Sequence, residues 1–185
     1  MISDSISNAE NKMDKAVESA QHDYSTIRTG RANINILDRV VVDYFGSQMP
    51  INQLAQVSVP EPRQILIAPW DKTVIPLIEK AIMKSDIGLN PNTDGAGIRL
   101  IIPQLTEERR KEFIKVLHKK AEEHRVSIRN IRRDTNDEFK KLEKAGNASE
   151  DEVKRAETQL QKITDKHIEH IDHLTKSKES ELMEV

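Results

Sequence analysis

The 185-residue chain contains no cysteine and no long apolar run. The lack of cysteine excludes disulfides, thiol catalysis and cysteine-ligated zinc or iron–sulfur sites, and it suits a reducing compartment. The polar N-terminal sequence MISDSISNAENKMDK and the lack of an 18-residue apolar stretch predict neither a secretory leader nor a membrane span. We therefore expect a cytoplasmic protein with no membrane partner.

Aromatic residues are also scarce, at 3% of the chain, whereas charged residues make up 32%. This composition favours long amphipathic helices over a large mixed core. We expect most of the aromatic residues to lie in cores, which would leave no platform for stacking single-stranded bases.

Three segments show the apolar period of amphipathic helices. The first covers about the opening 27 residues and ends near Gly30. The second runs from Thr106, which suits an N-cap, to Gly146, which suits a C-terminal cap. The third begins at Ser149, which has Glu152 three residues on as in a capping box, and it continues to the C-terminus. Near-heptad spacing and a short loop predict a left-handed antiparallel three-helix bundle.

The residues of the three predicted stripes share a spacing of three or four. They are Ile6, Ala9, Met13, Ala16, Val17, Ala20, Tyr24 and Ile27; Leu117, Ala121, His124, Ile128, Ile131, Thr135, Phe139 and Leu142; and Val153, Ala156, Leu160, Ile163, Ile171, Leu174 and Leu182.

Residues 30–105 differ from these segments in being rich in β-branched residues and proline. They predict short strands at 39–44, 56–59, 64–68 and 98–102, one helix at 72–85, and turns at Gly46, Pro50, Pro60 and Pro62. We expect a small β/α/β domain (30–105) inserted into a discontinuous bundle domain (1–29 and 106–185), an α+β protein overall. The two short links that join the domains can act as a hinge. The predicted hinge residues are Thr29, Gly30, Arg31, Pro103, Gln104 and Leu105.

Positive charge is concentrated in the second predicted helix. Residues 109–133 contain ten lysines and arginines against three glutamates, a local charge of +7 in a chain whose net charge is −2. Off the apolar stripe or at its flanks lie Lys111, Lys115, Arg125, Arg129, Arg132 and Arg133. A solvated helix face paired with glutamates is the ordinary explanation of such a pattern. Because the four arginines have few acids in register, we instead expect a phosphate-binding face for a folded RNA.

Five motifs resemble the bacterial ribosome recycling factor family, and together they extend over nearly the whole chain. They are IRTGRA at 27–32, EKAIMKSDIGLNP at 79–91, LTEERRKEF at 105–113, RVSIRNIRRD at 125–134 and the closing KESELMEV. The resemblance implies an L-like, tRNA-shaped molecule with a three-helix bundle as the long arm and the β/α/β domain as the short arm.

The resemblance also implies a function and a set of contacts. Members of that family bind the large ribosomal subunit after termination and split post-termination ribosomes together with elongation factor G, which hydrolyses GTP, so that mRNA and tRNA are released. The implied contacts to 23S rRNA are Arg129, Arg132 and Arg133, with Arg28, Arg109 and Arg110 nearer the elbow. We add Arg125 to this set from the charge pattern. The expected protein is a monomer without a cofactor.

No catalytic constellation can be assembled from the sequence, so we do not expect an enzyme. His167, His170 and His173 form an H-x-x-H-x-x-H run, but on a helix they spread over about 120° and cannot converge on one metal ion. The DGAGIR loop at 94–99 leads into a strand rather than a helix, which indicates a turn and not a nucleotide site. Two binding functions stay open: a coiled-coil adaptor, and a general RNA chaperone.

Overall fold

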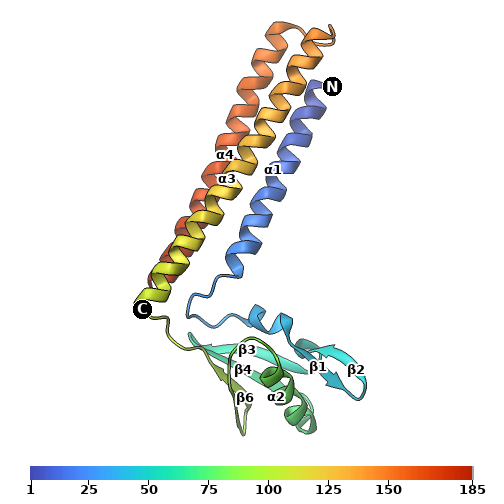
Figure 1. Ribbon diagram of the computed structural model, residues 1–185. Helices are drawn as coiled ribbons and strands as arrows, with labels where there is room; N and C mark the ends of the chain where they lie inside the picture. Colours follow the sequence, from blue (N-terminus) through green and yellow to red (C-terminus); the bar gives the residue numbers. More distant parts are fainter. Residues whose placement is uncertain (185) are drawn as a thin grey trace. The chain divides into compact units, whose positions relative to one another are not determined.

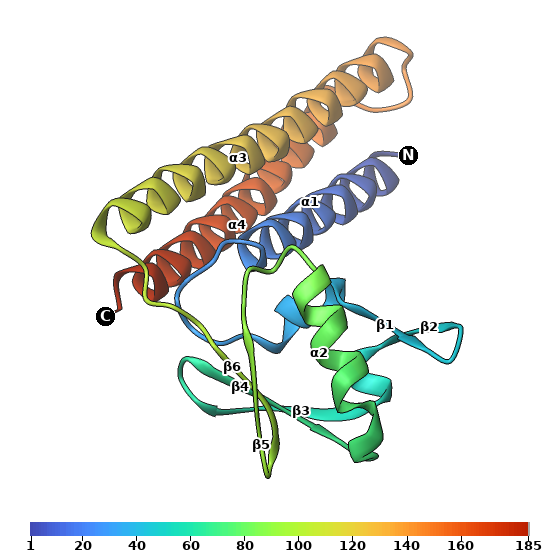
Figure 2. The ribbon, with the colours of Figure 1, turned by 60° about the horizontal axis from the view of Figure 1, so that its bottom comes forward.

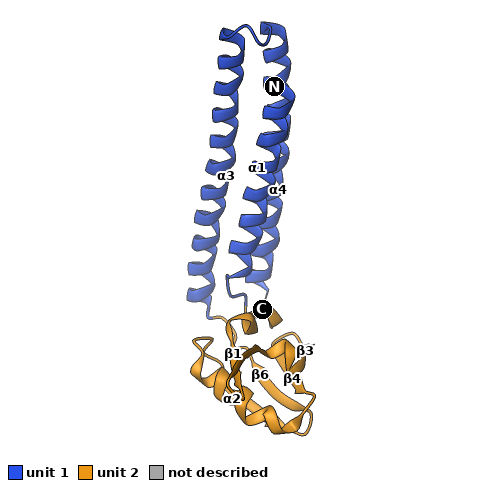
Figure 3. Ribbon diagram, turned by 90° about the vertical axis from the view of Figure 1, so that its right-hand side faces the viewer, with its two compact units in different colours: residues 1–29, 106–185 blue, residues 30–105 orange. Residues whose placement is uncertain are grey.

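The computed structural model describes residues 1–184. Its backbone separates into two compact units (Figure 3). Unit 1 comprises Met1–Thr29 and Thr106–Val185, and unit 2 comprises Gly30–Leu105. Each unit has its own architecture.

Unit 1 is a bundle of three long helices, α1 (Ile2–Ser25), α3 (Glu107–Lys144) and α4 (Glu150–Met183) (Figure 1). Two polar pairs between α1 and α4 show the relative directions of these helices. The Tyr24 hydroxyl on α1 lies 2.8 Å from the Thr175 hydroxyl on α4, and Asp14 Oδ1 lies 2.7 Å from His167 Nε2. Residue numbers therefore rise together along α1 and α4, whereas α3 runs antiparallel to both. The predicted antiparallel three-helix bundle is confirmed.

The helix ends are set by local signals that the sequence predicts. The Thr106 hydroxyl accepts a hydrogen bond from Arg109 N at 3.2 Å, so Thr106 caps α3. At the other end Gly146 adopts a φ of +74°, and Asn147 N donates to Leu142 O at 2.9 Å. This is a Schellman ending, which favours glycine because a side chain is strained at positive φ. Ser149 and Glu152 form the predicted capping box of α4.

Most predicted stripe residues are buried in the bundle, and three buried polar residues join them. Ala16, His124, Ile131, Leu142, Ile163 and Leu174 lie only partly buried at the edges of the seam. Ile27 is buried, although α1 ends at Ser25. Thr164 and Thr175 were not predicted as core residues, nor was His167. The two threonine hydroxyls donate to carbonyls four residues earlier at 2.7 Å, which satisfies them inside the core.

Unit 2 is a four-stranded antiparallel sheet in the order β3-β4-β6-β5, with one helix and a separate β1-β2 hairpin (Figure 2). The elements are η1 (Ile34–Arg39), β1 (Val41–Tyr44), β2 (Ser47–Pro50), η2 (Ile51–Gln53), β3 (Ala55–Glu61), β4 (Gln64–Pro69), η3 (Lys72–Val74), α2 (Ile75–Lys84), β5 (Pro91–Asp94) and β6 (Gly97–Ile101).

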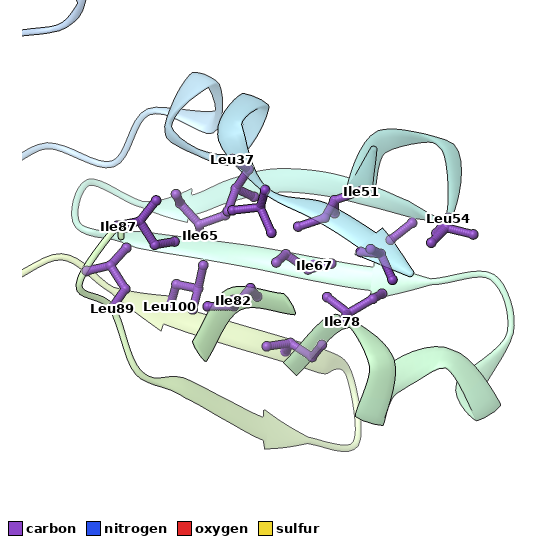
Figure 4. Packing of buried hydrophobic residues seen from close by; sticks show 14 of the residues in the cluster. Leu37, Ile51, Leu54, Ile65, Ile67, Ile78, Ile82, Ile87, Leu89 and Leu100 are labelled. Atoms are coloured by element: carbon purple, nitrogen blue, oxygen red, sulfur yellow. The ribbon is translucent and has the colours of Figure 1, made fainter. Parts of the chain in front are cut away.

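The core of unit 2 lies between α2, the sheet and the base of the hairpin. Ile78 and Ile82 of α2 pack with Ile65, Ile67 and Leu100 of the sheet, and all five are essentially inaccessible to solvent (Figure 4). The alternation of these residues along β4 and β6 is the pattern of a sheet with one covered face. The α+β fold class predicted from the sequence is confirmed for these elements.

Several details of unit 2 differ from the prediction. Strands β2 and β5 were not predicted, and the start of the segment 39–44 belongs to η1. Pro50 and Pro60 lie inside strands rather than in turns. They are tolerated there because β2 and β3 are edge strands, in which a proline on the outer side removes no ladder hydrogen bond.

The DGAGIR loop is the turn of the β5-β6 hairpin, as its sequence predicts. Asp94 Oδ1 accepts from Ala96 N at 2.8 Å and closes the turn. A Cβ atom at Gly97 would lie 2.2 Å from the Ile67 carbonyl oxygen, and the φ of Gly97 is +140°. Glycine is therefore required at position 97 by the close approach of β4, which accounts for the second glycine of the G-x-G without a nucleotide.

Candidate nucleic-acid interface

The predicted RNA-binding arginines lie at two levels of α3 and in the segment after α1. The middle of α3 carries four of them, which we call the arginine face: Arg125, Arg129, Arg132 and Arg133. Arg109 and Arg110 lie in the first turn of α3, about 22 Å along the helix from Arg125. Arg28 is exposed and follows the end of α1. Since His124 Nε2 lies 2.8 Å from Asp23 Oδ2, the end of α1 is level with the N-terminal half of α3, and Arg28 belongs to that end of the bundle.

Arg125 and Arg129 are paired with acids, which corrects the expectation that few acids lie in register with them. Arg125 Nε donates to Asp172 Oδ1 of α4 at 2.7 Å, and its Nη1 donates to Glu122 Oε2 at 3.1 Å. Arg129 Nη1 donates to the other oxygen of Glu122 at 3.0 Å. Asp172 could not be found from helix spacing because it comes from another helix. Glu122 is three residues before Arg125, so this partner was visible in the sequence and was underestimated.

The ion pairs shift the pKa values of Glu122 and Arg125. Hydrogen bonds from Arg125 and then Arg129 hold the pKa of Glu122 below its ordinary value. Partial burial alone would lower the pKa of Arg125, but its hydrogen bonds to Asp172 and Glu122 outweigh burial, and the pKa is raised. Arg125 therefore keeps its charge, and Arg125 and Arg129 both line a shallow groove between α3 and α4.

Arg132 is held differently, by a neutral partner. Its Nη1 donates to Gln161 Oε1 of α4 at 2.7 Å, and Gln161 Nε2 donates in turn to Asp165 Oδ1 at 2.8 Å. Arg132 Nε is buried and has no acceptor among the described residues. This arginine is thus oriented by an amide that leaves its charge uncompensated, an arrangement suited to a phosphate ligand.

The remaining predicted arginines have weaker partners. Arg133 is exposed, and its Nη1 reaches Asn130 Oδ1 only at 3.4 Å. Arg109 Nη1 lies 3.3 Å from Glu112 Oε2 in an exposed pair of the kind that contributes little to stability. Arg110 is half-buried, and its Nε has no acceptor within residues 1–184. Side-chain pairing therefore compensates the charge of Arg125 and Arg129 more completely than that of Arg132 and Arg133.

The residues of the predicted hinge belong to the two crossings between the units. Ala32 N donates to Pro62 O at 2.7 Å, and Ile102 N donates to Arg63 O at 2.8 Å. Both crossings are therefore tied to the same β3-β4 turn inside unit 2. Gly30 has a φ of +75°, and a Cβ there would lie 3.7 Å from Leu105, so the crossings run next to each other. Motion at these links stays a prediction.

The three histidines of the H-x-x-H-x-x-H run do not lie together in one environment. His167 is buried against Asp14 whereas His170 and His173 are exposed, and no cluster of three metal-binding side chains occurs in the described part of the chain.

The expectation that aromatic residues lie mostly in cores was wrong for two of them. Phe45 is 84% exposed and Trp70 is 69% exposed. Neither lies on the bundle.

No helix among residues 1–184 carries an apolar run long enough to cross a membrane.

Comparisons with known proteins agree on one family. The sequence profile described as ribosome recycling factor matches residues 20–183. The chain is 60% identical to the ribosome-recycling factor of Desulfitobacterium hafniense and 55% identical to that of Desulforamulus reducens, over 185 residues and 100% of both chains in each case.

Solved structures give the same result. A solution structure of the ribosome recycling factor is 44% identical, with a TM-score of 0.77, and the match covers 100% of this chain and 98% of that one. A second structure describes models for the T. thermophilus ribosome recycling factor and the E. coli elongation factor G bound to the E. coli post-termination complex. It is 43% identical, with a TM-score of 0.67 and full coverage of both chains. With a profile match over most of its length and full-length relatives above half identity, the chain belongs to the ribosome recycling factor family.

Proposed function

We propose that this chain recycles ribosomes after translation termination by binding 23S rRNA of the large subunit through the arginine face of α3. The observation that carries the proposal is Arg132, which Gln161 orients without neutralising it, beside the exposed Arg133. Guanidinium groups held in this way bind phosphate oxygens in pairs, and a folded RNA presents such oxygens along its backbone. Arg28, Arg109 and Arg110 extend the proposed contact toward the first turn of α3.

Elongation factor G is the proposed protein partner. The support is the homologous structure in which a ribosome recycling factor and elongation factor G are bound to one post-termination complex. In this proposal GTP hydrolysis belongs to that factor, and the present chain is a non-enzymatic monomer. In this proposal unit 1 binds RNA, and unit 2 receives the force that elongation factor G exerts. The two links, from Thr29 to Arg31 and from Pro103 to Leu105, bend as the ribosomal subunits separate.

A subunit-splitting assay on post-termination ribosomes tests the proposal. Light scattering should fall when the chain, elongation factor G and GTP are all present, and it should stay constant when any one of them is omitted. Intact scattering in the complete mixture would contradict the proposal.

Two other binding functions make different predictions for the same purified chain. A coiled-coil adaptor would bind a protein partner independently of salt and would not retain large subunits. A general RNA chaperone would bind many unrelated RNAs with similar affinity. Recovery of intact large subunits in preference to mixed RNA, with binding that weakens as salt rises, favours recycling.

A further inference from the structure

The tip of the β1-β2 hairpin combines two unfavourable features in one residue. Phe45 and Gly46 form its two-residue turn, and both have positive φ, +50° and +85°. Glycine or asparagine is the usual first residue of such a turn, because a bulky side chain is strained in this region. The ring of Phe45 is also 84% exposed, the largest exposure among the exposed large hydrophobic side chains of the described chain.

The Phe45 ring makes few contacts that could stabilise the fold. The ring contacts Tyr44 edge-on, with 4.7 Å between ring centroids and 76° between planes, and it does not enter the core of unit 2. Strain that persists at an exposed aromatic residue points to a role outside the folded chain. Phe45 is therefore a candidate for contact with another molecule.

The hairpin holds this ring on a firm base. Val40, Val42 and Ile51, at the foot of the ribbon, are all buried in the core of unit 2. At the tip, Asp43 Oδ1 accepts a hydrogen bond from Gly46 N at 3.1 Å and fixes the turn. The ribbon extends beyond the edge of the four-stranded sheet, so its tip is free of the rest of unit 2 (Figure 2). A ring that is already positioned loses little conformational freedom on binding.

The charge of the hairpin segment itself indicates the kind of partner. The sequence between Arg39 and Arg63 contains Asp43 and Glu61 but no lysine or arginine. The hairpin itself therefore offers a nucleic acid no positive charge and one negative charge, on Asp43, whereas proteins that stack bases combine aromatic rings with basic grooves. A rigid aromatic side chain with an acidic neighbour instead matches an anchor of a protein interface, which enters an apolar pocket with a polar rim.

We propose that Phe45 is a protein-docking anchor: its ring enters an apolar pocket, rimmed by basic side chains, on a protein of the post-termination complex. This inference rests on the proposed function but concerns a surface separate from the arginine face. It gives the β1-β2 hairpin a binding role and explains why phenylalanine occupies a position that favours glycine.

Substitution separates this role from a structural one. Phe45→Ala and Phe45→Asn should each raise the concentration needed for half-maximal recycling by about tenfold, as expected for the loss of an anchor residue. Because asparagine tolerates positive φ, Phe45→Asn should leave the melting temperature equal or higher. Met83→Ala is the matched control, since Met83 is 71% exposed in the same unit, and it should change neither quantity.

Crosslinking then identifies the class of partner. Phe45 is replaced by p-benzoylphenylalanine, and the chain is irradiated on purified post-termination ribosomes with elongation factor G and a non-hydrolysable GTP analogue. A crosslink to a protein supports the proposal. A crosslink to rRNA overturns it, as does a lack of any crosslink, unchanged half-saturation in both Phe45 variants or a lower melting temperature for Phe45→Asn. If the unmodified chain does not recycle at all, the proposed function has failed instead.

Discussion

Arg132 of α3 and Gln161 of α4 are joined by a hydrogen bond of 2.7 Å between Nη1 and Oε1, and Asp165 fixes the amide from its other side. The bond crosses between two antiparallel helices, so bundle packing sets the direction of this guanidinium. It differs from the pairing of Arg125 and Arg129, which share the carboxylate of Glu122. The arginine face thus contains two members paired with carboxylates, Arg132 oriented by a neutral amide, and the exposed Arg133.

Arg132→Ala should weaken binding to the large subunit without unfolding the bundle. Loss of one phosphate contact should reduce the slope of log affinity against log salt by about one unit. The measurement is a filter-binding series at several salt concentrations. Arg155→Ala, an exposed arginine on α4, is the control and should retain the parent slope. Parent affinity and slope in the Arg132 variant would show that Arg132 does not contact RNA.

Gln161→Ala should also weaken binding, but through the freedom it gives to Arg132. Because no charge is removed, the salt slope should stay at the parent value while affinity falls by a few fold. The double-mutant cycle with Arg132→Ala should show a coupling of about 0.5–1.5 kcal/mol, as expected for one hydrogen bond. Additive effects of the two substitutions would mean that Gln161 does not position this arginine.

Ile128→Asp should unfold the bundle. Ile128 is completely buried on the apolar side of α3, and aspartate would place an unpaired carboxylate among three helices. The free energy of unfolding should fall by several kcal/mol. Circular dichroism melting measures this, and Ile128→Val is the control, with an expected loss of about 1 kcal/mol. A melting temperature equal to that of the parent would be incompatible with the buried position.

Replacing unit 2 with a short linker should separate binding from splitting. Since the crossings run side by side at Gly30 and Leu105, a few Gly-Ser residues can join 29 to 106. The resulting rod should bind large subunits and compete with the intact chain, yet fail to split ribosomes with elongation factor G and GTP. Splitting at the parent rate would show that unit 2 is dispensable. A folded rod that does not bind would place RNA affinity in residues 30–105.

Acid should weaken the start of α4 in a defined direction. Hydrogen bonds from the Ser149 backbone and hydroxyl hold the pKa of Glu152 below its ordinary value. A lowered pKa in the folded state stabilises the fold above the ordinary carboxyl pKa of about 4.3, and this contribution is lost as the pH falls through the folded value. Ser149→Ala should therefore lower the melting temperature at pH 7 by more than at about pH 3. An equal loss at both pH values would exclude a contribution from Glu152 ionisation.

The sequence by itself determined the elements whose signals are local. Thr106, Gly146 and the Ser149–Glu152 pair mark helix ends because a cap needs only residues within one turn of the chain. The stripes that contain Ile128 and Leu160 repeat with the helical period, and this repeat predicts which face is buried. The family motifs are likewise continuous stretches of sequence, and the profile and full-length relatives confirm the family that they indicate.

Tertiary structure decided what depends on residues far apart in the chain. Strands β2 and β5 are short and polar, so they are defined by their hydrogen-bonded partners rather than by their own sequence. Asp172 and Gln161 meet the arginine face only because α4 packs against α3, 47 and 29 residues away. The exposure of Phe45 follows from a hairpin whose foot is buried and whose tip is not. Local spacing carries no information about these contacts, because they arise only when separate elements pack together.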